Sequence, residues 1–156
     1  MSHTAALALA LWPLTYTATS TLMVNYEGNA PLAGPEFPVG LLGSYIATQI
    51  DLMQSPEVLL PVIDKLKLTQ KKDYADGYSG SDNTLRQFIE TKLRKNLLVE
   101  QGKYGSYLIY ATYASSDPIE AAEVATSVAG IYADHAHKSL TGPAADRATR
   151  YRTQWK

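Results

Sequence analysis

The sequence contains no cysteine among its 156 residues, which excludes disulfide bonds and thiolate metal sites. It also lacks an excess of charge, because 14 Lys and Arg residues face 15 Asp and Glu residues for a net charge of −1. This balance gives no electrostatic reason to expect nucleic acid as a partner. Phe and Trp are scarce, with two of each, whereas there are eleven Tyr. Tyr packs with one apolar and one wet end, so the excess predicts many half-buried positions, some of them at interfaces.

The N-terminal apolar run is too short to cross a bilayer, which takes about 20 residues. It covers Ala5–Leu14 and contains Pro13. No Lys or Arg precedes it, so it matches a secretory signal peptide poorly. Two interpretations remain for residues 1–15: an N-terminal strand or arm packed on the domain, or a remnant of an N-terminal membrane helix.

Hydrophobic periodicity predicts one strand and two helices in the first half of the chain. Tyr16–Val24 alternates Thr with aliphatic residues, as a strand does. Residues 25–40 hold three Pro and three Gly and form a loop. Leu41–Gln54 has helical spacing, and the Ser55-Pro56-Glu57 start signal, with Ser55 as N-cap, opens a second helix that ends near Leu68.

The second half of the chain predicts a helix, two strands and a further helix. Residues 69–82 are expected to form a polar loop, and Asp82 or Asn83 to cap the third helix. Leu97–Glu100 and Ser106–Ser115 are typical of two strands joined around 102–105. Asp117, as N-cap before Pro118, starts a helix that runs to about Lys138 and is interrupted at 141–143.

This order of elements predicts an α+β fold: a small mixed or antiparallel sheet packed against several helices, with the start of a long helix at the C-terminus. The length fits one compact domain. We assign residues 16–140 to that domain and residues 141–156 to the beginning of a truncated further helix.

Candidate catalytic and metal-binding patterns are weak throughout. His135 and His137 lie two residues apart, on opposite faces of a helix, and cannot share a metal ion. The stretch 77–83 resembles a nucleophile motif only loosely, and turn chemistry explains it better. The sequence therefore predicts no catalytic residue, no cofactor and no metal ligand.

The charged groups have equally plain explanations. Two carboxylate pairs, Asp51 with Glu57 and Glu120 with Glu123, are explained by helix capping and solvated faces. A short basic cluster lies near the end of the third helix, where the helix dipole favours cations; it consists of Lys92, Arg94 and Lys95.

Several blocks of sequence, in the same order over about 130 residues, carry a family resemblance. YTATSTLMV follows an apolar leader, SYIATQIDLMQSPEVLLPVIDKLKL covers 44–68, LIYATYASSDPIEAAEVATSVAGIY covers 108–132, and TGPAADRATRYRTQW closes the chain. These blocks resemble the chain length determinant (Wzz-type) family, the polysaccharide co-polymerases of bacterial inner membranes. In detail they are most similar to the exopolysaccharide members of EpsF type.

The resemblance implies a non-enzymatic regulator of polysaccharide chain length in exopolysaccharide biosynthesis. Members of the family have two membrane helices and a periplasmic domain between them. Ala5–Leu14 would be the periplasmic end of the first helix, and residues 141–156 the start of a coiled coil. The implied location is the bacterial inner membrane, with this segment periplasmic. The implied partners are further copies of the chain, a polysaccharide polymerase and the nascent polysaccharide.

The helix after Pro118 is the candidate protomer contact. Its Ala-rich faces allow close approach, and Tyr132 can anchor a neighbour. The face with Glu120, Glu123 and His137 is the better candidate for contact, because the apolar face covers the protein's own sheet; that face contains Val124, Val128 and Ile131.

Three other functions stay open from the sequence. One is a periplasmic sensor or modulator domain of a bacterial tyrosine-kinase system. Another is a hydrolase with converging carboxylates. The third is a polysaccharide-binding module with aromatic stacking platforms, for which the candidates are Tyr26, Tyr78, Tyr104, Tyr107 and Tyr110.

Overall fold

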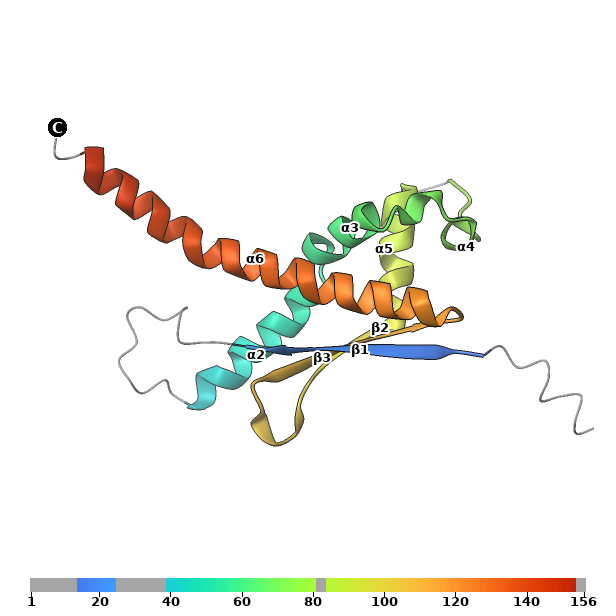
Figure 1. The fold of residues 1–156 in the computed structure, drawn as a ribbon, viewed down its shortest axis with the longest axis horizontal. Coiled ribbons are helices and arrows are strands. Elements are labelled where there is room, and N and C mark those ends of the chain that lie inside the picture. Colours follow the sequence, from blue (N-terminus) through green and yellow to red (C-terminus); the bar gives the residue numbers. More distant parts are fainter. Residues whose placement is uncertain (1–13, 25–38, 81–83, 154–156) are drawn as a thin grey trace, which may run out of the picture.

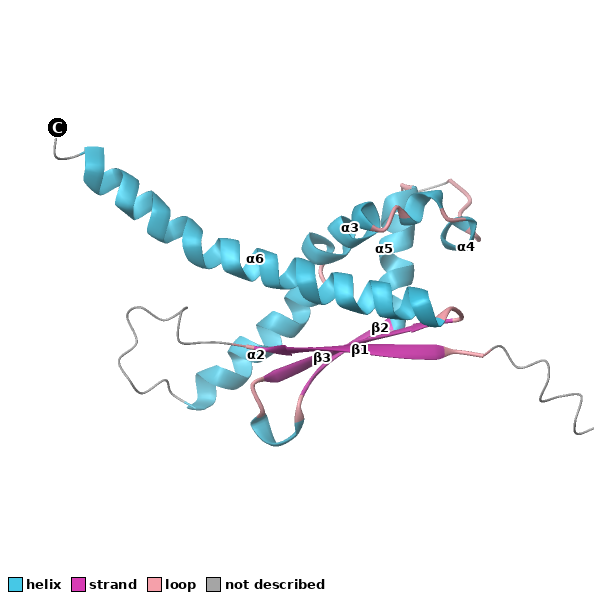
Figure 2. Ribbon diagram, viewed as in Figure 1, coloured by secondary structure: helices cyan, strands magenta, loops and turns pink. Residues whose placement is uncertain are grey.

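The fold is α+β, with a three-stranded antiparallel sheet and helices over one of its faces (Figures 1 and 2). The computed structural model describes residues 14–24, 39–80 and 84–153. The elements in chain order are β1 (Tyr16–Met23), α2 (Val39–Met53), α3 (Pro56–Lys65), η1 (Leu68–Gln70), α4 (Lys72–Ala75), α5 (Leu85–Asn96), β2 (Leu97–Gln101), η2 (Lys103–Gly105), β3 (Leu108–Ser115) and α6 (Pro118–Thr153). Within the described residues, none of the helices combines the length and the apolar character that crossing a membrane requires.

The sheet has the order β1-β3-β2, so the first strand of the chain pairs with the last. Tyr16 lies opposite Ser115 in one pair of strands, and Leu97 lies opposite Tyr113 in the other. Both pairs of strands are antiparallel. Of the two sheets that the sequence allows, mixed or antiparallel, the structure has the antiparallel one. On the uncovered face, the hydroxyls of Thr19 and Thr112 share a hydrogen bond of 2.8 Å across the strands.

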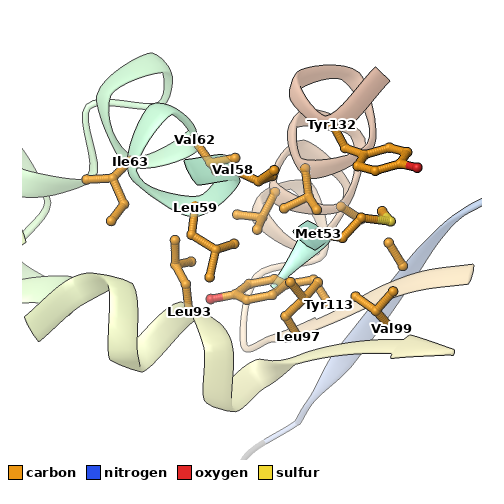
Figure 3. Close-up of a cluster of buried hydrophobic side chains, with 14 of the residues drawn as sticks. Met53, Val58, Leu59, Val62, Ile63, Leu93, Leu97, Val99, Tyr113 and Tyr132 are labelled. Atoms are coloured by element: carbon orange, nitrogen blue, oxygen red, sulfur yellow. The ribbon is translucent and has the colours of Figure 1, made fainter. Parts of the chain in front are cut away.

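The core lies between the covered face of the sheet and helices α3 and α6 (Figure 3). Alternate residues of β3 are buried on this face, because successive side chains of a strand point to opposite sides. The largest fully buried side chains come from four helices, the short η1 and the central strand: Ile46, Met53, Leu59, Ile63, Leu68, Ile89, Leu93, Ile109, Val124 and Val128. The apolar face predicted for the helix after Pro118 is confirmed for Val124 and Val128, which are buried, while Ile131 is half-buried.

Helix α6 begins where the sequence predicts. The Asp117 carboxylate accepts the backbone N–H of Ile119 at 2.9 Å, and Pro118 occupies the first helical position. The predicted interruption at 141–143 is wrong, because α6 continues unbroken to Thr153. A proline inside a helix removes one hydrogen bond, and the residues that follow Pro143 are mostly good helix formers.

The predicted polar loop at 69–82 is also wrong in part. It contains the short helices η1 and α4, and Tyr74 of α4 is buried with 4% of its surface exposed. Lys67 takes a left-handed conformation with φ of 52°, which turns the chain into η1. Leu68 of η1 and Tyr74 of α4 thus anchor a segment whose composition is that of a loop.

The helix caps follow the sequence only in part. Ser55 is the N-cap residue of α3, but its hydroxyl donates to the Leu52 carbonyl at 2.7 Å and does not cap the helix. Thr84 is the N-cap of α5, in a reciprocal capping box with Gln87. Asp82 and Asn83, the predicted caps, lie outside the described residues, as do residues 1–13 and 25–38.

The capping box predicts a stability difference between two threonines of α5. Thr84→Ala removes the cap and should lower the free energy of unfolding by about 1 kcal/mol. Thr91→Ala is the matched control, because Thr91 is an exposed residue inside the same helix and should change stability by less than about 0.5 kcal/mol. Urea unfolding of the two variants makes the comparison, and equal losses would contradict the assignment of the cap.

Candidate functional site

One pocket, of about 280 Å³, combines polar and aromatic side chains at the end of the sheet where β3 leads into α6. Its walls come from the residue before β1, from α4 and α5, from the end of β3 and from the first turn of α6. The lining residues are Thr15, Asp73, Tyr74, Lys92, Asn96, Tyr113, Ala114, Ser115, Ser116 and Glu120. Segments far apart in the sequence therefore meet here.

Two buried tyrosines face each other in this pocket. The hydroxyls of Tyr74 and Tyr113 lie 3.3 Å apart and share a hydrogen bond. Burial is the main cause that raises the pKa of Tyr74 above its usual value, and the contact with Tyr113 adds to the shift. Burial also raises the pKa of Tyr113. Both phenols therefore stay protonated and act as neutral hydrogen-bonding groups at physiological pH.

Glu120 lies at the junction of β3 and α6. Its Oε2 accepts the Ser115 hydroxyl at 2.7 Å, and its Oε1 lies 3.4 Å from the Lys71 ammonium. Its side chain is 19% exposed. The Ser115 hydroxyl also accepts the Asp117 backbone N–H at 3.1 Å. These bonds fix the carboxylate against the strand.

The α5 side of the pocket supplies a cation and an amide. Lys92 donates from Nζ to the Asp73 backbone carbonyl at 2.6 Å, which ties α5 to α4. Asn96 donates from Nδ2 to the Lys92 carbonyl at 3.1 Å. The site thus contains hydrogen-bond donors and acceptors, among them a cation and a carboxylate. Such an arrangement is suited to binding a polar ligand by hydrogen bonds.

The predicted protomer-contact residues have different surroundings. Glu120 belongs to the pocket, and Tyr132 is 6% exposed, with its hydroxyl donating to Gln49 Oε1 at 2.8 Å. Glu120 was predicted on the exposed contact face and Tyr132 as an anchor for a neighbour. The polar atoms of both bond within the chain, and whether either residue contacts another protomer stays a prediction. Glu123 and His137 are exposed on α6. The role of these two in protomer contacts stays a prediction.

The two histidines of α6 lie in different surroundings. His135 Nε2 lies 3.6 Å from Glu57 Oε2 and connects α6 with α3, whereas His137 is exposed. Asp51, which the sequence analysis considers together with Glu57, is exposed on α2. In the described part of the chain, no three His, Asp or Glu residues are grouped so that they could hold a metal ion.

The predicted aromatic platforms that the structure describes lie on different segments of the chain. Tyr104 is fully exposed in η2 and has a φ of 62°, while Tyr107 is 40% exposed nearby. Tyr110 is half-buried on the uncovered face of the sheet. Tyr78 packs against Phe88 with ring centroids 5.6 Å apart. Tyr26 lies outside the described residues.

The basic cluster of α5 is engaged in local structure. Besides the Lys92 bond, Arg94 lies 3.6 Å from Glu90 Oε2, one turn earlier in the helix. Glu90 is 6% exposed, and its Oε1 has no hydrogen-bond partner. Sequence reasoning missed this buried carboxylate, because its position in the helix gives no sign that it is buried.

Sequence reasoning also missed most of the pocket. Tyr74 lies in the predicted loop 69–82 and Tyr113 in the predicted strand Ser106–Ser115, and neither prediction brings the two residues together. The Asp117-Pro118 start signal could have placed Glu120 beside the end of β3, since it sets the turn between strand and helix.

In comparisons with known proteins, neither a family model nor a curated protein matches the chain.

Buried tyrosines predict a loss of stability at alkaline pH. Burial raises the pKa of Tyr132 from 10.0 to about 12. Above pH 10 the unfolded chain loses this proton while the folded chain keeps it, so the free energy of unfolding falls as pH rises toward 12. Tyr132→Phe should flatten the fall between pH 10 and 12, measured by urea unfolding at stepped pH.

The control for this prediction is Tyr104→Phe, which removes a hydroxyl from a fully exposed side chain. This variant should reproduce the pH profile of the parent protein. If Tyr132→Phe leaves the profile as steep as Tyr104→Phe does, burial of Tyr132 is not the source of the alkaline sensitivity.

Proposed function

We propose that the protein is a non-catalytic regulator of polysaccharide chain length, of the Wzz type, that acts with a membrane polysaccharide polymerase in exopolysaccharide biosynthesis. The observation that carries the proposal is helix α6. It has 36 residues, which corresponds to a length of about 54 Å. Its first half covers the sheet, and its second half extends away from the rest of the domain (Figure 1).

A helix that outruns its own domain supports a scaffold role. A helix is stabilised mostly by packing of an apolar face, so a projecting half gains stability from a neighbour. In the proposed assembly that neighbour is a further part of the same protein or another copy of it. The order of strand, helices, paired strands and long helix agrees with the resemblance of sequence blocks described above.

The proposed setting is the bacterial inner membrane, with the described domain on the periplasmic side. The proposed partners are other copies of the chain, the polymerase and the growing polysaccharide. In this proposal the protein acts by positioning its partners and performs no bond-making step.

Deletion of the gene in the producing bacterium tests the function. The polymer should still be made, but its length distribution on a gel should change, and a plasmid copy should restore the original distribution. Complete loss of polymer would indicate an essential biosynthetic step instead. An unchanged length distribution would overturn the proposal.

The exposed face of α6 provides a second test, in the full-length protein. Glu123→Arg reverses a charge on the candidate contact face and should weaken assembly, measured by cross-linking in membranes. Asp51→Arg is the matched control, because Asp51 is an exposed carboxylate on α2. Equal assembly of the two variants would remove Glu123 from the protomer contact.

A further inference from the structure

The pocket at the junction of β3 and α6 has more hydrogen-bonding capacity than the fold uses. The hydroxyls of Tyr74 and Tyr113 bond each other, and each has a second partner, Glu120 for Tyr74 and Asn96 for Tyr113. The capacity that remains to this pair lies in the acceptor positions of the two phenol oxygens. The Lys92 ammonium has three N–H donors and gives one to Asp73. The Glu120 carboxylate has about four acceptor positions and bonds three groups, Ser115, Lys71 and Tyr74. This surplus lies around one open space.

The charges around the pocket are balanced. Glu120 is paired with Lys71, and the ammonium of Lys92 donates to the backbone carbonyl of Asp73, a residue that also lines the space. Two cations and two carboxylates give no net charge. Since a site for phosphate or for a metal ion would carry an excess of one sign, the balance favours an uncharged ligand.

The walls combine these polar groups with aromatic and aliphatic carbon. The lining includes the aromatic residues Tyr74 and Tyr113 and the hydroxyl-bearing residues Thr15, Ser115 and Ser116. A molecule with hydroxyl groups on a carbon frame matches both properties. The volume of about 280 Å³ lies at the lower end of the range for small-molecule sites, so it suits a single small ligand.

We propose that this pocket binds a small, neutral, polyhydroxylated ligand, a single sugar unit, through the phenol pair Tyr74–Tyr113, the carboxylate of Glu120 and the ammonium of Lys92. The inference deepens the proposed function, in which the growing polysaccharide is a partner, and it rests on that function only for the source of the sugar. It also stands by itself: the pocket's chemistry selects the ligand whether or not the protein sets polymer length.

The test is a titration of the intact chain with neutral monosaccharides, namely glucose, galactose, mannose and N-acetylglucosamine, followed by amide chemical shifts. At least one of them should bind and shift amides of residues 113–120 together with those around Tyr74. Tyr74→Phe and Tyr113→Phe should each weaken that binding by about tenfold, the loss expected for one neutral hydrogen bond. Tyr132→Phe is the matched control: it also removes a buried hydroxyl, but outside the pocket.

A second variant keeps the test decisive if the phenylalanine variants unfold. Ser116→Trp places a bulky ring at an exposed lining position and should abolish binding without disturbing the core. Ser44→Trp, at an exposed serine of α2 outside the lining, should bind as the parent protein does.

Three results would overturn the inference. They are no binding of any neutral sugar up to its solubility limit, equal binding by Ser116→Trp and Ser44→Trp, and binding of inorganic phosphate or glucuronic acid in place of the neutral sugars. Because the assay uses the isolated chain, its failure is separate from failure of the gene-deletion experiment.

Discussion

The packing of α6 across one face of the sheet is the constraint on which the remaining structure depends. The strands cannot form a core by themselves, since the inward positions of β1 are held by Ala18, Ser20 and Leu22 and are only half-buried. Helix α6 contacts both β1 and β3, and its buried Ala121 and Ala125 allow close approach. Covering this face excludes water from the apolar side chains of the central strand.

The short connection between β3 and α6 transmits this constraint to the pocket. Only two residues separate Ser115 from Pro118, and the Asp117 carboxylate caps the helix within that turn. Glu120 consequently lies one helical turn from the strand end, where Ser115 holds its carboxylate. The place of the acidic group in the pocket is therefore a consequence of how the helix starts.

The phenol pair makes the pocket and the core interdependent. Tyr113 belongs to the covered face of β3, and Tyr74 is the residue that folds α4 against the domain. Both rings are part of the interior, yet their hydroxyls line the pocket. A pocket built on rings fixed by packing is preorganised, because little side-chain freedom is left to lose on binding.

Local signals explain why most of the fold was predictable from the sequence. The strand pattern in 108–115, the Ser55-Pro56-Glu57 start of α3 and the Asp117-Pro118 start of α6 each depend on neighbouring residues, and each is confirmed. The errors have non-local causes. Tyr74 orders a polar segment through Tyr113, 39 residues away, and no local pattern announces that pairing. The pocket was missed for the same reason, since its residues come together only when the sheet order places β3 between β1 and β2.

The same helix also connects the pocket with the projecting end of the molecule. The first turn of α6 lines the pocket, its middle packs on the sheet through Val124 and Val128, and its last turns lie beyond the domain. Helix α6 is continuous from Pro118 to Thr153, so its start and the sheet face together determine the direction in which it leaves. A substitution that tilts the packed half of α6 on the sheet also moves its projecting end. The displacement grows with distance along the helix, which is about 54 Å long. Small, closely packed residues at Ala121 and Ala125 are thus as important for the orientation of the projecting half as any residue within it.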